Sequence, residues 1–280
     1  MTVKDLLVHV DANPNAGKRL EAAMVLAESF RAHLSVLALV AEPFVPAIEG
    51  VHIPQHLLEQ QLEAAEREAE VVLAAARATA ERRGIAIETR RETGPIDQLP
   101  ALLARQARHA DLTLVGQPDL ERQGVDDALL VEAAFMDSGR PALVIPYIGA
   151  RIMPPKRVLL GWDGSREASR AAHDALPLLT QALAVTLLVV DPQRHADRLG
   201  EQAGADLAAH LARHGVRVEV KTVASGGLAI GDVILAQMSD EAADLLVMGG
   251  YGHSRLREFV LGGVTRRLLE HMTCPVLLAH

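Results

Sequence analysis

The chain contains an internal repeat, and this feature restricts its possible folds more than any other. A run of apolar residues that ends on Asp11 matches a second run that ends on Asp163, and an amphipathic helical pattern follows each, over 17–33 and 165–182. Each copy has five short apolar runs that resemble strands: 5–11, 34–40, 85–88, 109–116 and 141–145, then 157–163, 185–190, 216–219, 242–249 and 275–279. The repeat therefore predicts two similar domains of five strands each.

Strands and helical patterns alternate in both copies, and the strands are apolar along nearly their whole length. This combination is typical of parallel sheets that helices cover on both faces through right-handed crossovers. At 280 residues the chain also exceeds the usual size of one domain. We expect an α/β fold with two doubly wound five-stranded parallel-sheet domains in tandem, over 1–150 and 151–280, joined near 149–155.

The first copy carries an insertion between its second and third strands. Asp11 and Asp163 are 152 positions apart, whereas Asp111 and Asp244 are 133 apart. The inserted residues contain a helical pattern that would be roughly 45 Å long if unbroken from 54 to 83. Its apolar residues form one narrow stripe: Leu58, Leu62, Ala65, Ala69, Val72, Ala76 and Ala80. We interpret it as an extended crossover helix on the sheet, with a partner-binding or coiled-coil helix as the alternative.

The composition narrows the partners and the compartment. The net charge is -8 and aromatic residues make up 2%, which argues against a nucleic-acid binder. No run of about 18 uncharged apolar residues is present and residues 1–5 lack the features of a signal peptide, so we expect a cytoplasmic protein without membrane contact. The single cysteine, Cys274, excludes an internal disulfide and agrees with a reducing compartment.

Two groups of glycines distinguish the end of the second copy. Gly249, Gly250 and Gly252 directly follow its fourth predicted strand, where the backbone must turn or approach a ligand closely. Gly262 and Gly263 precede a helical pattern. A helix that begins near Gly263 would direct unpaired N–H groups and a positive dipole end toward the first group of glycines. We therefore expect an anionic ligand.

Other features of the second copy meet at the same place. Ligands of open parallel sheets bind at the carboxyl ends of the strands, where the strand order reverses. Asp163 ends the first predicted strand of this copy, and Val189 and Val190 end the second. A carboxylate accepts hydrogen bonds from a ribose hydroxyl or an adenine amino group, and apolar strand ends enclose a base. Together with the glycines, these residues predict a nucleotide site.

With these motifs the whole chain resembles the universal stress proteins in their tandem two-domain form, which have an adenine nucleotide alpha hydrolase-like fold. Members that bind ATP have a glycine, two residues, a glycine, nine residues and a further glycine, and this pattern matches Gly249, Gly252 and Gly262. The resemblance implies that ATP, possibly accompanied by Mg²⁺ on its phosphates, contacts Gly161, Trp162, Asp163, Val189, Val190, Met248, Gly249, Gly252, His253, Gly262, Gly263, Val264 and Thr265.

One position departs from the family pattern. The residue after the last glycine usually offers a hydroxyl or amide to the phosphates, but here it is Gly263. A lost neutral hydrogen bond costs about 0.5–1.5 kcal/mol, which corresponds to roughly threefold to tenfold in affinity. His253, Arg255 and Thr265 remain close in the sequence. We therefore expect weaker ATP binding rather than none.

The first copy departs from the pattern much further. Asp11 is retained, but residues 117–121, directly after Gly116, contain no second glycine. The segment that replaces the glycines is acidic and would repel phosphates: Asp119, Glu121, Asp126, Asp127 and Glu132. We expect the first domain to be a degenerate partner that binds no cofactor and is retained for packing or regulation.

Other candidate sites have plainer interpretations. The pairs His52–His56 and His210–His214 have the i,i+4 spacing of helical metal ligands, but the sequence offers no third ligand, so we expect solvated helix faces and no metal site. Ser165 has no catalytic histidine in its neighbourhood, and we interpret it as a helix cap.

The sequence thus favours a stress-response sensor or regulatory protein whose second domain binds ATP. A slow ATPase and a nucleotide-free dimerisation scaffold are the alternatives. Asp163 and Thr265 are the only plausible contacts for Mg²⁺ and neither is a dedicated base, so no catalytic residue is assigned. The resemblance further implies that the two domains pair through their fifth strands, 141–145 and 275–279, and a homodimer could be built on that pair.

Overall fold

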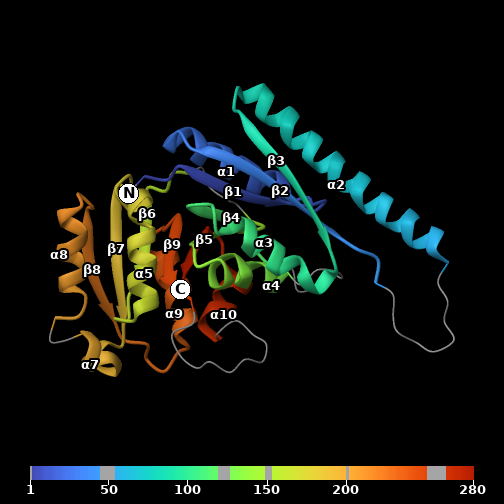
Figure 1. The fold of residues 1–280 in the computed structure, drawn as a ribbon. Helices are drawn as coiled ribbons and strands as arrows, with labels where there is room; N and C mark the ends of the chain where they lie inside the picture. Colours follow the sequence, from blue (N-terminus) through green and yellow to red (C-terminus); the bar gives the residue numbers. More distant parts are fainter. Residues whose placement is uncertain (1, 45–53, 119–126, 149–152, 200–201, 251–262) are drawn as a thin grey trace, which may run out of the picture.

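The computed structural model describes residues 2–44, 54–118, 127–148, 153–199, 202–250 and 263–280. Strands and helices alternate along both halves of the chain (Figure 1). The N-terminal domain consists of β1 (Asp5–Val10), α1 (Ala16–Phe30), β2 (His33–Ala41), α2 (Gln55–Arg83), β3 (Ile87–Gly94), η1 (Ile96–Gln98), α3 (Leu99–Ala107), β4 (Leu112–Gly116), α4 (Asp127–Glu132), the π-helical turn η2 (Ala133–Asp137) and β5 (Ala142–Ile145). The C-terminal domain consists of β6 (Arg157–Gly161), α5 (Arg166–Asp174), α6 (Leu176–Leu179), β7 (Ala184–Val190), η3 (Pro192–His195), α7 (Ala196–Leu199), α8 (Ala205–Arg213), β8 (Val218–Val223), α9 (Ile230–Asp240), β9 (Leu245–Gly249), α10 (Gly263–His271) and β10 (Val276–Ala279).

All ten strands belong to one sheet, in the order β3-β2-β1-β4-β5-β10-β9-β6-β7-β8. Every pair of neighbours is parallel except β5 and β10, which are antiparallel and join the two domains. The predicted contact between the fifth strands is therefore observed, with Leu277 opposite Leu143 and Val276 opposite Val144. In each domain the strand order reverses beside the first and fourth strands, so the switch points lie at β1/β4 and β6/β9.

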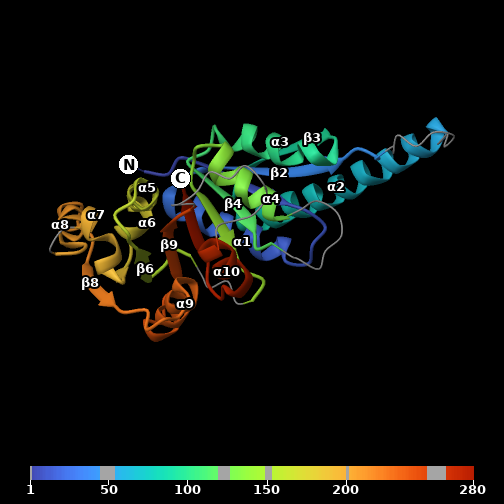
Figure 2. The same cartoon turned by 90° about the horizontal axis from the view of Figure 1, so that it is seen from below.

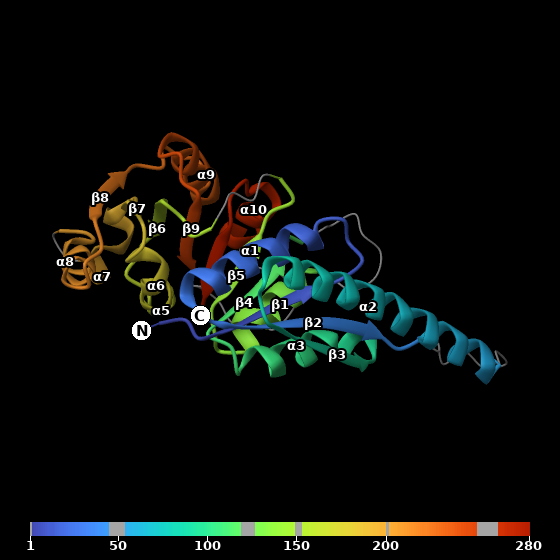
Figure 3. The ribbon, with the colours of Figure 1, turned by 90° about the horizontal axis from the view of Figure 1, so that it is seen from above.

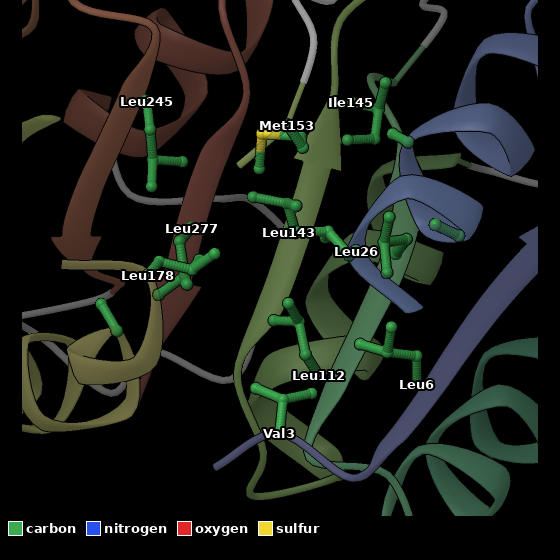
Figure 4. Packing of buried hydrophobic residues seen from close by; sticks show 14 of the residues in the cluster. Val3, Leu6, Leu26, Leu112, Leu143, Ile145, Met153, Leu178, Leu245 and Leu277 are labelled. Carbon is green, nitrogen blue, oxygen red and sulfur yellow. The ribbon is translucent and has the colours of Figure 1, made fainter. Parts of the chain in front are cut away.

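Helices cover both faces of the sheet, as the apolar strands predict (Figure 3). One core cluster lies under α1, α2, α5, α6 and α8, and the other under α3, η2, α9 and α10. Each cluster contains residues of both domains, so the core continues across the contact between the fifth strands. Figure 4 shows this region, where Leu143, Met153 and Leu277 are at most 2% exposed. The outermost strands, β3 and β8, both carry charged residues, and charged edges oppose pairing with another chain.

The inserted helix α2 is continuous for 29 residues, as predicted. Its C-terminal half buries Ala69, Leu73, Ala76 and Ala80 against β2 and β3, so the crossover interpretation is correct for this half. The N-terminal half projects past the end of the sheet (Figures 1 and 3). The helix ends at Gly84, whose left-handed backbone (φ 70°) suits a residue without a side chain.

The structure also tests two expectations from composition. Cys274, the single cysteine of the chain, is buried, and its Sγ lies 3.7 Å from the backbone carbonyl oxygen of Pro275. Among the helices of the described residues, none is long and apolar enough to cross a membrane.

Candidate functional site

A cavity of about 430 Å³ lies at the carboxyl ends of β6, β7 and β9, beside the switch point of the C-terminal domain. The first turn of α10 and the first turns of α5 and α9 complete its wall (Figure 2 shows α9 and α10 beside β9). The lining residues are Gly161, Trp162, Asp163, Ser165, Glu167, Ala168, Leu188, Val190, Asp191, Arg194, Ile230, Ile234, Met248, Gly249, Gly263, Val264 and Thr265. Most of the residues that the sequence assigned to the nucleotide therefore share one cavity.

Local hydrogen bonds fix the position of Asp163 at the start of α5. Its Oδ1 accepts a hydrogen bond from the backbone N–H of Ser165 at 3.0 Å. The Ser165 hydroxyl in turn accepts one from the backbone N–H of Ala168 at 3.1 Å, which is the helix cap that the sequence predicted. The carboxylate is thus held at the cavity wall by the same turn that begins the helix.

The opposing walls of the cavity are apolar. Leu188 and Val190 contribute from β7, and Ile230 and Ile234 from α9. The prediction that Val189 also contacts the ligand is wrong for this cavity, because successive side chains of a strand point to opposite faces. The Val189 side chain is fully buried on the other face, where its Cγ2 would be 3.4 Å from a Cβ at Gly204.

The glycines have different structural roles. A Cβ on Gly249 would lie 2.5 Å from the backbone N of Ala168, so this glycine allows α5 to approach β9 closely. A Cβ on Gly250 would overlap the ring of Phe135 from the N-terminal domain. At Gly263 no atom of the described residues lies within 4 Å of a Cβ position, so this part of the structure leaves space for a side chain. Packing alone thus requires Gly249, a glycine of the motif, and its neighbour Gly250.

Three predicted contacts cannot be placed. Gly252, His253 and Gly262 lie outside the described residues. That these residues contact the nucleotide stays a prediction.

Two of the carboxylates that line the cavity, Glu167 and Asp191, are paired with arginines, which limits the repulsion of an anionic ligand. The Glu167 carboxylate lies 2.5 Å from Arg166 Nε, and Asp191 lies 3.2 Å from Arg194 Nε. Burial raises the pKa of Glu167, but hydrogen bonds from Arg166 and a backbone N–H, with the nearby charge of Arg166 and His280, outweigh burial and leave the pKa below its ordinary value. Arg194 is well exposed at the cavity wall.

Several lining residues were missed by the sequence analysis. Asp191 directly follows the β7 end that the analysis singled out, and Arg194 lies one turn later. Ile230 and Ile234 are one helical turn apart at the start of α9, so both face the same side. The rule that ligands bind at the carboxyl ends of strands could have identified Asp191, whereas the placement of α9 required the structure.

The N-terminal domain has a smaller, acidic cavity at the corresponding end of its sheet. It measures about 290 Å³ and lies between β1, β2 and α2. Asp11, Glu68 and Asp127 contribute carboxylates, and no lysine or arginine lines the cavity among the described residues. Carboxylates disfavour phosphates. Of the acidic residues that the sequence singled out in this copy, Asp127 lies at the cavity wall, whereas Asp119, Glu121 and Asp126 lie outside the described residues.

A buried arginine is a further difference between the first copy and the second. Arg19 is 5% exposed and its Nη2 lies 2.7 Å from Asp11 Oδ1. Its guanidinium also occupies the space beside Gly116, the counterpart of Gly249. The position equivalent to Arg19 in the second copy, 152 residues later, is Ala171. The aspartate that the first copy retains is therefore engaged by its own chain.

A cluster of histidines lies outside the cavity. The ring centroid of His210 is 4.7 Å from that of His214 and 5.0 Å from that of His173 on α5. No group of metal-ligating side chains with suitable geometry occurs among the described residues, which include this cluster. Desolvation lowers the pKa of His210, and the nearby charges of His214, His173 and Arg213 lower it further. Its Nε2 is buried without a hydrogen-bond partner.

This pKa shift predicts acid sensitivity. Because the folded pKa of His210 lies below the value of 6.5 that applies to the unfolded chain, the unfolded chain binds the proton more readily. The stabilisation is complete above about pH 6.5 and is lost as the pH falls through the folded pKa. We expect the thermal midpoint to fall between pH 8 and pH 5.5, and the fall to be smaller in His210→Gln. An equal fall in the variant would contradict the assignment.

The fold and the cavity define a tandem, doubly wound α/β protein with a ligand site at the switch point of its second domain. The model of the universal stress protein family matches residues 2–132 and 154–280. The chain therefore belongs to the universal stress protein family, and two domains of this family lie in tandem.

Individual relatives agree with this assignment. The universal stress protein Slr1230 of Synechocystis is 25% identical over 302 residues, which cover 98% of this chain and 99% of that protein. A universal stress protein of Thermus aquaticus, in the QAH/OAS sulfhydrylase 3′ region, is 31% identical over 134 residues, 44% of this chain and 97% of its own length. The crystal structure of a universal stress protein from Archaeoglobus fulgidus has the same fold, with a TM-score of 0.71 at 17% identity, and the match covers 98% of this chain and 97% of that one.

Proposed function

We propose that the C-terminal domain, over 151–280, binds an adenine nucleotide, ATP, and that the protein acts as a sensor or regulatory module in the stress response. The observation that carries the proposal is the single cavity in which Asp163, two apolar walls and the first turn of α10 meet. Its volume of about 430 Å³ falls within the range of small-molecule sites. Membership of the universal stress protein family supports the stress-response role.

Each part of the cavity suits one part of ATP. Val190 and Ile234 belong to the apolar walls that would enclose the adenine. The carboxylate of Asp163 would accept hydrogen bonds from a ribose hydroxyl or the adenine amino group. The unpaired N–H groups at the start of α10, from Gly263 to Thr265, would hold the phosphates. Any Mg²⁺ would arrive on the phosphates, where Asp163 and Thr265 offer oxygen atoms.

The N-terminal domain, over 1–150, is proposed to be a degenerate partner that binds no nucleotide. Its acidic cavity and the Arg19–Asp11 ion pair support this assignment. The nucleotide-free scaffold remains the second candidate. However, β5 pairs with β4 and β10, and β10 pairs with β9, so both edges of each fifth strand are occupied within one chain. A homodimer would therefore need a different surface.

Analysis of bound nucleotide tests the proposal. The purified protein is denatured and the released small molecules are measured by mass spectrometry, and calorimetry measures binding of added ATP. We expect an adenine nucleotide or a measurable affinity for ATP. Absence of bound nucleotide, together with no heat of binding at millimolar ATP, would favour the scaffold instead. Turnover of labelled ATP that disappears in Gly249→Val would indicate a slow ATPase, whereas turnover that persists in this variant would indicate a contaminant.

Substitution of Gly263 by serine is expected to raise ATP affinity by roughly threefold to tenfold, the value of one hydrogen bond. A Cβ at this position meets no atom of the described residues within 4 Å. Gly263→Ala is the matched control, because it adds a Cβ without a hydroxyl. Equal calorimetric affinities for the serine and alanine variants would contradict the assignment of this position to the phosphates.

A further inference from the structure

Helix α10 connects the cavity to the N-terminal domain. Its first turn, with Gly263, Val264 and Thr265, lines the cavity. Its last turn meets Gln117, which directly follows β4 of the N-terminal domain. The helix has nine residues and is therefore about 14 Å long. A displacement at one end of such a short, rigid element is transmitted to the other end.

Gln117 closes the C-terminal end of α10. Its Nε2 donates a hydrogen bond to the carbonyl oxygen of Leu269 at 2.7 Å. Leu269 belongs to the last four residues of the helix, whose carbonyl groups have no partner within the helix itself. Because Gln117 is only 7% exposed, water has little access to replace this bond.

The N-terminal domain holds Gln117 in place through two hydrogen bonds. Its backbone N–H donates to the carbonyl oxygen of Ile145 at 2.9 Å, which extends the pairing of β4 with β5. Its side-chain Oε1 accepts a hydrogen bond from the backbone N–H of Tyr147 at 3.0 Å. The amide therefore has a fixed orientation, with its donor directed at α10.

A second contact from the N-terminal domain reaches the end of β9. The ring of Phe135, in η2, is fully buried and abuts Gly250 so closely that a Cβ there would overlap it. Gly250 itself is fixed by its N–H, which donates to the carbonyl oxygen of Ala279 at 2.9 Å. Gly250, which precedes the segment 251–262, and Leu269, in the helix that follows it, are thus both in contact with the other domain.

We propose that Gln117 and Phe135 are positioning residues for the phosphate end of the cavity. The inference rests on the proposed nucleotide site and extends it: the N-terminal domain sets the position of α10 and of Gly250, and so sets the affinity of the C-terminal domain for phosphates. This role gives the N-terminal domain a function, although its own cavity is acidic and its Asp11 is paired with Arg19. Any change in the N-terminal domain that moves Gln117 would alter nucleotide affinity.

Gln117→Leu tests the proposal, because leucine keeps most of the volume and removes the donor. We expect ATP affinity to fall by about threefold to tenfold, the effect of one hydrogen bond. Adenosine affinity should not change, since adenosine lacks the phosphates that α10 would hold. Gln106→Leu is the matched control, because Gln106 also makes two side-chain hydrogen bonds within the N-terminal domain, to Arg90 and Glu92. If Gln117 had only a structural role, Gln117→Leu would lower the affinities for ATP and adenosine equally or would change neither.

Hydrogen exchange provides a readout that does not depend on nucleotide. The amides of α10 in the ligand-free protein should exchange faster in Gln117→Leu than in the wild type or in Gln106→Leu. Phe135→Leu, which keeps an apolar side chain, should likewise lower ATP affinity more than adenosine affinity. Unchanged exchange in α10, or an unchanged ratio of the two affinities in both variants, would overturn the inference. If the wild type bound neither ligand, the nucleotide site would be refuted, while faster exchange would still support control of α10 by the N-terminal domain.

Discussion

The double variant Val144→Asp with Leu277→Asp is expected not to fold. Both side chains are at most 1% exposed and lie on the two strands that join the domains. Each aspartate would be buried without a partner, at a cost of several kcal/mol or a pKa raised until it is protonated. Domains of this kind have a total stability of about 5–15 kcal/mol. Circular dichroism and size-exclusion chromatography should therefore show an unfolded or aggregated chain.

The matched control places two aspartates at exposed apolar positions. Ile148 and Leu183 are 73% and 59% exposed, so Ile148→Asp with Leu183→Asp adds the same charge without burying it. This variant should retain the thermal midpoint of the wild type within a few degrees. A folded Val144→Asp with Leu277→Asp variant, with an unchanged midpoint, would mean that the fifth strands are not the contact that holds the chain together.

The effect on both domains follows from the shared core. Val144 belongs to the cluster on one face of the sheet and Leu277 to the cluster on the other. Each cluster contains residues of both domains, so the hydrophobic core is continuous between them. For this reason we expect one cooperative unfolding transition in the wild type, although the sequence is a clear repeat.

The repeat predicted the fold well because its strands are buried on both faces. Runs such as 157–163 and 275–279 are apolar without alternation, which leaves few other interpretations, and the observed β6 and β10 lie within them. The end of the first copy was harder, because its helical segment is short and continues as a π-helical turn. The antiparallel pairing of β5 with β10 followed only from the family resemblance, since strand patterns alone do not specify which edges meet.

The site was predicted in part for similar reasons. Residues at strand ends, such as Asp163 and Val190, could be placed because parallel strands end at one edge of the sheet. The face to which Val189 points depends on the register of the strand, which the apolar run leaves open. Arg19 could not be foreseen as buried, because a charged residue on an amphipathic helix is normally exposed. Gln117 reaches α10 across 152 positions of the sequence, a contact with no local signal.

Gly249 shows how one sequence signal can have two physical causes. The motif placed this glycine at the phosphates, but in the structure its lack of a side chain also makes room for α5. A Cβ would lie 2.5 Å from both the N of Ala168 and the carbonyl carbon of Glu167, and 2.9 Å from the Cβ of Glu167. Two of these neighbours are backbone atoms, which cannot move aside as a flexible side chain can. Any residue other than glycine must therefore displace the start of α5.

Gly249→Val is consequently expected to damage the nucleotide site and the fold together. The displaced turn includes Ser165, whose N–H holds the Asp163 carboxylate, so the cavity loses its shape at the adenosine end. Overpacking of this kind costs about 1–3 kcal/mol. If the strain is relieved when α5 moves in the empty protein but returns when ATP binds, ATP affinity should fall by about tenfold to a hundredfold. The thermal midpoint should fall by several degrees, at about 2–4 °C per kcal/mol for a chain of this size.

Gly263→Ala distinguishes the packing of α5 from the binding of phosphates. A Cβ at Gly263 has no atom of the described residues within 4 Å, so this variant changes the motif without overpacking the described part of the structure. This control should keep the thermal midpoint of the wild type and most of its ATP affinity, measured by calorimetry in parallel with Gly249→Val. If Gly249→Val bound ATP as the wild type does, the cavity beside α5 would not be the nucleotide site. If the Gly249→Val variant lost thermal stability but kept its affinity for adenosine, the displaced start of α5 would not alter the position of the Asp163 carboxylate. Only a joint loss of stability and of affinity for both ligands agrees with a glycine that serves the packing of α5 and, through Ser165 and Asp163, the binding of the nucleoside.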